Sequence, residues 1–217
     1  MTQSTRRFND FSLATVVTGP PWYQNCYIVR HVPTGASVVV DPGGAADRVI
    51  AAVEAEGGKP DAIWLTHGHP DHIGAARAVE KAFAIPTRFH AAEAPVIARA
   101  SELNRAFSGE PLQPPATLES FDGEPQLELG GQPVRVVHCP GHTPGGVTFD
   151  FGAFALTGDT LFMQGVGRTD LPGGSEKALW GSITRLLPLL ADDTVLYSGH
   201  GPEWSAREAK RWWRLME

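Results

Sequence analysis

The sequence predicts an α+β fold in which two β-sheets pack together and helices cover them from outside. Short β-rich segments and helical segments mix in both halves of the chain, and glycine-rich polar stretches follow several of the β-rich segments. No period of roughly 20 to 50 residues repeats, which excludes solenoids and propellers. Two packed sheets with outer helices would bury such a mixture, and the stretches that follow the strands would gather at one edge. We expect residues 1–217 to form a single domain of this kind.

The first half of the chain supplies strands and helices in alternation. The apolar run at residues 11–17 is interpreted as the first strand, and β-rich residues 25–30 and 37–41 flank a Pro33-Thr34-Gly35 turn, which predicts a hairpin. Helical spacing of Ala, Val and Ile predicts a helix over 45–56, before a short buried strand at 62–65. The other elements expected here are a helix at 73–83, a strand at 87–90, a helix at 91–107 and a mobile surface loop at 109–115.

The second half repeats this alternation loosely. Its residue pattern predicts strands at 134–138, 147–151, 154–157 and 194–197, and helices at 175–187 and 205–216. Trp212-Trp213, at helical spacing from Trp204, is expected in the core. His31, His90 and His138 have no metal-ligand spacing, so we interpret them as surface or strand-end residues.

The composition is that of a soluble globular protein acting on small molecules. Hydrophobic residues make up 42% and charged residues 19%, and no stretch approaches the roughly 20 apolar residues of a membrane span. The net charge of -6 does not match the basic surfaces that bind nucleic acid. We therefore expect a small-molecule substrate, with neither nucleic acid nor a membrane as partner.

Cysteine usage and the N-terminus indicate a cytoplasmic protein. Cys26 and Cys139 belong to no paired motif, which favours a reducing compartment, and Cys139 is expected to be a packed small side chain rather than a nucleophile. Thr5-Arg6-Arg7-Phe8 faintly resembles a twin-arginine signal. However, the apolar run that follows it is short and contains Ser12 and Thr15, unlike a signal peptide.

The segment Thr66-His67-Gly68-His69-Pro70-Asp71-His72 carries four potential metal ligands directly after a predicted strand. His67 and His69 are two residues apart, so a locally extended backbone points both imidazoles to one side, where one ion can take both. Asp71 and His72 offer an oxygen and a nitrogen to a second ion. The alternative, a polar loop whose histidines only bond to backbone, does not explain this density of ligand types.

This segment resembles the THxHxDH signature of metallo-β-lactamase-fold hydrolases, and the resemblance extends to three later motifs. They are Cys139-Pro140-Gly141-His142-Thr143-Pro144-Gly145-Gly146, Thr157-Gly158-Asp159-Thr160 and Ser198-Gly199-His200-Gly201-Pro202. The resemblance implies a four-layer αββα sandwich with the active site at one edge of the two sheets. It implies that one ion is bound by His67, His69 and His142 and a second by Asp71, His72 and His200. Asp159 would bridge the two ions, and Asp41 would support the ligand loop from outside.

Such a ligand set implies hydrolysis. Zinc suits these nitrogen-rich sets, with iron or manganese as alternatives. Two divalent ions that share a water would lower its pKa from about 15.7 towards 7, so hydroxide would be the nucleophile at neutral pH. As carboxylate ligands of these ions, Asp71 and Asp159 are the expected catalytic residues. The ligands themselves leave ester, thioester, amide and phosphoester substrates open.

The stretch 158–174, Gly-Asp-Thr-Leu-Phe-Met-Gln-Gly-Val-Gly-Arg-Thr-Asp-Leu-Pro-Gly-Gly, is similar to the glyoxalase II branch of the family. Within that branch the chain resembles the compact, single-domain subgroup, which lacks the C-terminal helical domain that supplies basic and aromatic residues for glutathione in the two-domain enzymes. The resemblance implies hydrolysis of hydroxyacylglutathione thioesters such as S-lactoylglutathione. Arg168 would bind a substrate carboxylate, or would instead pair with Asp170. A basic stripe at Arg207, Lys210, Arg211 and Arg214 could partly replace the missing domain or form a solvated face.

Two other functions remain open from the sequence. Persulfide dioxygenases of the same fold share the histidine motif and a similar Gly-Arg-Thr-Asp loop, and would hold one iron with His67, His142 and Asp159. A non-catalytic binding protein could use the metals as structural staples, although structural zinc sites are usually closed and cysteine-rich. β-Lactam and RNA hydrolysis fit less well, because no secretion signal and no basic surface are evident.

Overall fold

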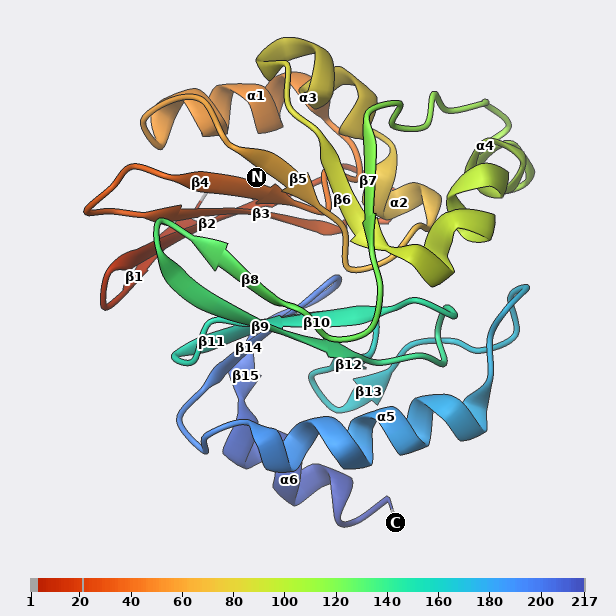
Figure 1. The fold of residues 1–217 in the computed structure, drawn as a ribbon. Helices are drawn as coiled ribbons and strands as arrows, with labels where there is room; N and C mark the ends of the chain where they lie inside the picture. The colour runs from red at the N-terminus through yellow and green to blue at the C-terminus, as the bar shows by residue number, and fades with distance from the viewer. Residues whose placement is uncertain (1–3, 21, 217) are drawn as a thin grey trace.

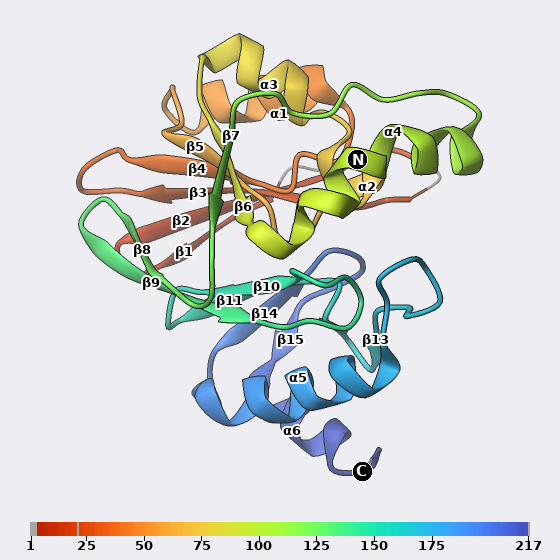
Figure 2. The same cartoon turned by 45° about the vertical axis from the view of Figure 1, so that its right-hand side comes forward.

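The computed structural model describes residues 4–20 and 22–216 and shows four layers (Figure 1). A seven-stranded sheet and a six-stranded sheet pack face to face, with α1 and α3 over the first sheet and α5 and α6 over the second (Figures 1 and 2). The predicted αββα sandwich is confirmed. No helix among the described residues combines the length and apolar composition that a membrane span needs.

The first sheet contains strands β1 to β7 in sequence order. They are β1 (Ser4–Phe8), β2 (Phe11–Val17), β3 (Asn25–His31), β4 (Ser37–Val40), β5 (Ala62–Trp64), β6 (Thr87–His90) and β7 (Leu118–Phe121). β1 to β4 pair antiparallel, and β3 and β4 form the predicted hairpin. β4 to β7 pair parallel, so helices connect them. The connecting helices are α1 (Ala46–Ala55), α2 (Pro70–Ile73), α3 (Ala76–Phe83) and α4 (Ala94–Ser108).

The second sheet has the strand order β15-β14-β11-β10-β9-β8. Its strands are β8 (Gln126–Leu129), β9 (Gln132–His138), β10 (Val147–Asp150), β11 (Phe154–Gly158), β14 (Val195–Ser198) and β15 (Trp204–Ser205). β11 and β14 pair parallel, and the crossover between them contains the helix α5 (Glu176–Leu189). The other pairs are antiparallel. A small hairpin of β12 (Leu161–Phe162) and β13 (Gly165–Val166) follows β11, and α6 (Ala206–Trp213) closes the chain.

Successive side chains of the central strands point to opposite faces of the sheet, so each strand contributes to two separate hydrophobic cores. In β3, Tyr27 and Val29 face the core between the sheets, whereas Cys26 and Ile28 face the helices α1 to α4. A third core joins the outer face of the second sheet to α5 and α6. Trp213 is buried there, and Trp212 packs against it partly buried, which confirms the expected core position.

Several expectations about the elements were wrong. The helix expected at 73–83 begins only at Ala76, as α3, and Ile73 instead ends the separate helix α2. The two helices are separated where Gly74 packs against the backbone of Gly43 and the Ala75 amide donates to the carbonyl of Pro42. The residues that resemble a twin-arginine signal form the edge strand β1. β1, β7 and β8 were not predicted, since their side chains are mostly exposed and polar and lack the apolar alternation of central strands. Residues 109–117 lie outside any helix or strand, as expected of a loop.

Candidate metal centre

All seven predicted ligand residues lie just beyond the end of a strand. His67 and His69 follow β5 in the first sheet, and Asp71 and His72 lie in the first turn of α2. The other three ligands follow strands of the second sheet: His142 after β9, Asp159 after β11 and His200 after β14. Loops from the two packed sheets therefore meet at one edge, as the sequence predicts.

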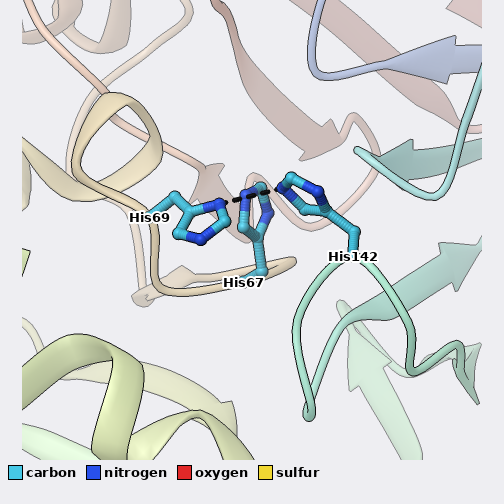
Figure 3. A group of neighbouring side chains, drawn as sticks. All are labelled: His67, His69 and His142. Atoms are coloured by element: carbon cyan, nitrogen blue, oxygen red, sulfur yellow. Dashed lines mark hydrogen bonds between the residues drawn. The ribbon is translucent and has the colours of Figure 1, made fainter. Parts of the chain in front are cut away.

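A first cluster unites His67, His69 and His142, whose ligand atoms lie within 4.8 Å of one another. The three imidazoles converge from two loops (Figure 3). Nδ1 of His69 lies 2.9 Å from Nε2 of His142. The three side chains are buried, so the loops present the nitrogens to a small shared space rather than to bulk water.

A second cluster unites Asp71, His72 and His200, again with ligand atoms within 4.8 Å of one another. Oδ2 of Asp71 lies 3.1 Å from Nε2 of His200 and 3.8 Å from Nε2 of His72. This cluster contains one carboxylate and two imidazoles, whereas the first contains three imidazoles.

Asp159 lies between the two clusters. Its Oδ1 is 3.2 Å from Nε2 of His72, and its Oδ2 is 3.5 Å from Nε2 of His200 and 3.6 Å from Nε2 of His142. One carboxylate therefore faces ligand nitrogens of both clusters, which is the arrangement expected of a bridging carboxylate.

Asp41 contacts the clusters from behind. Its carboxylate accepts hydrogen bonds from the amide of Thr66 at 2.7 Å, the hydroxyl of Thr66 at 2.5 Å and Nδ1 of His72 at 2.9 Å. Asp41, His67 and His72 also lie close enough to form a third potential ligand group. Because the carboxylate of Asp41 is already occupied by these three donors, the first two clusters are the better metal sites.

Hydrogen bonds from outside orient the ligand imidazoles. Nδ1 of His142 donates to the carbonyl of Arg168 at 2.7 Å, and Nδ1 of His200 donates to the carbonyl of Trp22 at 3.1 Å. Nδ1 of His67 lies 3.1 Å from the hydroxyl of Thr66, which itself donates to Asp41. With Nδ1 engaged in this way, each of these rings presents Nε2 to the centre.

Charges divide the centre into two halves. Burial lowers the pKa of His67 and lowers that of His69 to about 3, with neighbouring imidazoles adding to the effect. These rings are therefore neutral near pH 7 and ready to ligate. Burial opposes the charge of His200 as well, but hydrogen bonds to Asp159 and Asp71 outweigh it and raise the pKa of His200 to about 9. In the cluster of Asp71, His72 and His200, a proton on His200 therefore occupies the place where a metal cation would neutralise the carboxylates.

The residues fit a pair of metal ions. Among the described residues, Nε2 of His67, Nε2 of His72 and Oδ1 of Asp159 are buried and make no hydrogen bond of acceptable geometry, although the last two atoms lie 3.2 Å apart. Buried polar atoms without partners are costly, and all three of these face the centre of the clusters. The donors are imidazole nitrogens and carboxylate oxygens, which suit zinc or iron. The histidine and aspartate clusters are consistent with a binuclear metal site.

Glycines allow the loops to approach this closely. A Cβ on Gly199 would lie 2.1 Å from Oδ1 of Asp159 and 2.5 Å from Cε1 of His72. Gly158 has a φ of +50°, and a Cβ there would lie 2.4 Å from the hydroxyl of Thr66. These two positions explain why glycine precedes both Asp159 and His200.

Glu93 is a supporting residue that the sequence reasoning missed. Its carboxylate is buried and accepts from the amide of Gly68 at 2.7 Å and from the amide of Gly145 at 2.6 Å. Glu93 therefore ties the loop of His67 and His69 to the loop of His142. No spacing signals this role, because Glu93 lies inside a segment that the sequence predicts as an ordinary helix.

A pocket of about 350 Å³ opens over the centre. Its polar side is formed by ligands from both clusters together with Arg168, and its other side is aromatic and aliphatic. Arg168 pairs with Asp170 through two contacts of 2.7 Å, and both side chains are exposed. The structure therefore shows the salt bridge between Arg168 and Asp170, and Arg168 also lines the pocket.

The remaining side chains singled out in the sequence lie outside this centre. His31, His90 and His138 do end strands, but His31 and His90 are buried, so a surface position is wrong for these two. The ring of His90 stacks on that of His138 at 4.1 Å, which explains its burial. Cys139 is buried as expected, and burial raises the pKa of its thiol to about 11.

The fold and the site together define a four-layer αββα protein whose histidine and aspartate clusters are consistent with a binuclear metal site. Residues 19–200 match the model of the metallo-beta-lactamase superfamily, so the chain belongs to that superfamily. It is a metal-dependent hydrolase of this family.

Three relatives are similar over most of their length. An uncharacterized protein of Mycobacterium tuberculosis is 36% identical, over 82% of this chain and 85% of its own. The probable metallo-hydrolase YqgX of Bacillus subtilis is 34% identical, over 84% of this chain and 87% of its own. The hydroxyacylglutathione hydrolase GloC of Haemophilus influenzae is also 34% identical, over 87% of this chain and 90% of its own.

Two solved structures share the fold closely. BLEG-1 B3 metallo-beta-lactamase has a TM-score of 0.81 and 34% identity, covering 92% of this chain and 96% of that one. TTHA1623, solved in a di-iron-bound form, has a TM-score of 0.81 and 37% identity, covering 91% of this chain and 96% of that one. The chain is thus similar to proteins with different stated activities, so the reaction must be argued from the site.

Proposed function

We propose that the protein is a binuclear thioester hydrolase that cleaves hydroxyacylglutathione. The observation that carries the proposal is the position of Asp159 between two complete ligand clusters at the floor of one pocket. Similarity to hydroxyacylglutathione hydrolase GloC supports the choice of thioester. The stretch 158–174, which resembles glyoxalase II, lies beside the ligands, and Val166, Arg168 and Leu171 from it line the pocket.

The ligand assignment follows from the clusters. His67, His69 and His142 would hold one ion, and Asp71, His72 and His200 the other, with Asp159 shared between them. Zinc and iron both suit these donors, and the di-iron form of TTHA1623 supports iron as an alternative to zinc. When bound, such ions would polarise the thioester carbonyl and lower the pKa of a water.

The side chains around the pocket serve the same reaction. The water oxygen bonds to the carbonyl carbon, the C–S bond breaks, and the products are a hydroxy acid and a thiol. Burial alone would raise the pKa of Asp71 and Asp159, but interactions with His72 and His200 outweigh it and lower both pKa values. Both carboxylates are therefore ionised at neutral pH and available as metal ligands beside the attacking water. The guanidinium of Arg168 is placed at the pocket for a carboxylate of glutathione.

Metal analysis and parallel assays test this function. We expect purified protein to contain close to two ions per chain and to hydrolyse S-lactoylglutathione. A single iron per chain, with oxygen uptake in the presence of glutathione persulfide, would identify a persulfide dioxygenase instead. Turnover of a chromogenic cephalosporin without turnover of the thioester would assign the β-lactamase reaction. Two bound ions without activity on any of these substrates would overturn the thioester proposal.

A further inference from the structure

One wall of the pocket over the centre is built of apolar side chains from separate parts of the chain. Trp22 comes from the loop before β3, Phe107 from the last turn of α4, and Phe162 from β12. Val166 of β13 and Leu171 of the following loop complete this surface, which we call the aromatic wall. The pocket of about 350 Å³ lies at the small end of the range for small-molecule sites.

The aromatic wall adjoins the reacting centre. The ring of Phe162 stands edge-on to the imidazole of His200, with centroids 6.0 Å apart. The rings of Trp22 and Phe107 meet edge-on at 5.6 Å, and they are 38% and 45% exposed. Half-exposed aromatic rings that contact each other beside a reactive site present apolar area that a bound ligand would remove from water.

Few charged side chains in the pocket are available to bind the carboxylates of a substrate. Apart from histidines, Arg168 is the one cationic side chain among the described residues that line it, and it is paired with Asp170. The basic stripe of α6 lines other surface hollows and does not reach this pocket; Lys210 and Arg207 instead pair with Asp192. A glutathione thioester carries two carboxylates, so ionic contacts account for only part of its recognition here.

We propose that the aromatic wall binds an apolar substituent on the acyl group, so that the preferred thioesters carry an aromatic or branched hydrocarbon next to the reacting carbonyl. The inference rests on the proposed thioester hydrolysis. Because the wall and the ligands line the same small pocket, an acyl carbonyl at the ligands places its substituent against Trp22, Phe107 and Phe162. The glutathione portion then extends towards the exposed Arg168.

A matched pair of substrates tests the preference. S-lactoylglutathione and S-mandeloylglutathione share the thiol and the hydroxyl and differ by methyl against phenyl. We expect kcat/KM for the mandeloyl thioester to be at least about tenfold higher, the lower end of what one extra buried methylene group contributes in an apolar pocket. Equal values, or a preference for the lactoyl thioester, would overturn the inference while leaving thioester hydrolysis intact.

A binding measurement keeps the inference testable if neither thioester reacts. The product acids mandelate and lactate present the same carboxylate to the metal-loaded protein and differ by the same phenyl group. We expect mandelate to bind at least about tenfold more tightly in a calorimetric titration. Equal affinities would overturn the inference, whereas tighter mandelate binding without any thioester turnover would overturn the proposed reaction and still show that the wall binds the apolar substituent.

Variants locate the preference on the wall. Phe107→Ala and Phe162→Ala should each lower the mandeloyl-to-lactoyl ratio of kcat/KM severalfold, because each removes apolar contact area. Leu189→Ala is the matched control: Leu189 ends α5, is 42% exposed, and does not line the pocket. This control should keep the wild-type ratio. An unchanged ratio in both phenylalanine variants, with metal content and melting temperature preserved, would show that the wall does not select the acyl group.

Discussion

Oδ2 of Asp41 lies 2.9 Å from Nδ1 of His72, and both side chains are buried. Asp41 directly follows β4 and has a φ of +52°, a conformation that non-glycine residues rarely adopt. The same carboxylate accepts two hydrogen bonds from Thr66. One residue outside the ligand clusters therefore joins the end of β4 to both the histidine loop and α2, and it leaves Nε2 of His72 facing Asp159.

We predict that Asp41→Asn weakens binding of the second metal ion about 10-fold to 100-fold, the range for losing a partner of a metal ligand. The asparagine amide keeps the shape of the carboxylate but can place an N–H against Nδ1 of His72. Chelator competition measures the affinity. Asp61→Asn is the matched control, since Asp61 accepts from the amide of Ser37 at the other end of β4, far from the ligands in the sheet. Equal metal affinity in both variants would contradict the role of Asp41.

Glu93→Gln should weaken binding of the ion at His67, His69 and His142 at least about tenfold. The glutamine side chain has one acceptor oxygen in place of two, so the amide of either Gly68 or Gly145 loses its acceptor. This loss should also lower the free energy of unfolding by about 1–3 kcal/mol. Chelator competition and chemical denaturation separate these two effects.

Glu80→Gln is the control for this prediction. Glu80 is equally buried and accepts from the amides of Ala116 and Thr117, away from the centre. This variant should lose a similar free energy of unfolding and keep its metal affinity. If both variants lose stability and neither loses metal affinity, Glu93 acts only as a structural residue.

The sequence predicts the ligands better than their support. Each predicted ligand belongs to a short motif after a strand, and strand ends of packed sheets meet at one edge, so the local pattern was enough to predict which side chains the fold brings together. Glu93 acts through backbone amides of residues 25 and 52 positions away, and such contacts leave no local pattern. The contact of Trp22 with Phe107 likewise depends on how a loop and a helix end meet in space. Edge strands such as β1 were missed because exposed side chains carry no hydrophobic period.

We predict that Asp159→Ala lowers metal content below two ions per chain and reduces activity in parallel. Without this carboxylate, the ligand nitrogens of His72, His142 and His200 lose the group that lies among them. Elemental analysis after dialysis measures the content. Full metal content together with full activity would refute the bridging position of Asp159.

Metal binding to the second cluster should release protons at neutral pH. In the metal-free protein, hydrogen bonds to Asp159 and Asp71 outweigh burial and raise the pKa of His200 to about 9, whereas an ion needs its Nε2 unprotonated. Below about pH 9 the ion must displace this proton, so its affinity falls as pH falls, about tenfold per unit for each proton displaced. His67 and His69 have lowered pKa values and release none.

A pH indicator in weakly buffered solution measures this release during metal titration. His200→Asn should release about one proton fewer at pH 7 than the unchanged protein. Equal proton release from the two proteins would show that His200 is already neutral, and would contradict the predicted direction of the pH dependence.

Arg168→Ala should raise KM for S-lactoylglutathione about threefold to tenfold, the range for one exposed charge-assisted contact, while metal content stays unchanged. The ligand His142 bonds to the backbone carbonyl of Arg168, which the substitution retains. Asp170→Asn distinguishes the two roles of the guanidinium, because it removes the partner that Arg168 now holds. If Arg168 binds the substrate, this second variant frees it and KM stays constant or falls. If the pair only stabilises the loop, both variants shift KM in the same direction by similar amounts, and a substrate-binding role for Arg168 is excluded.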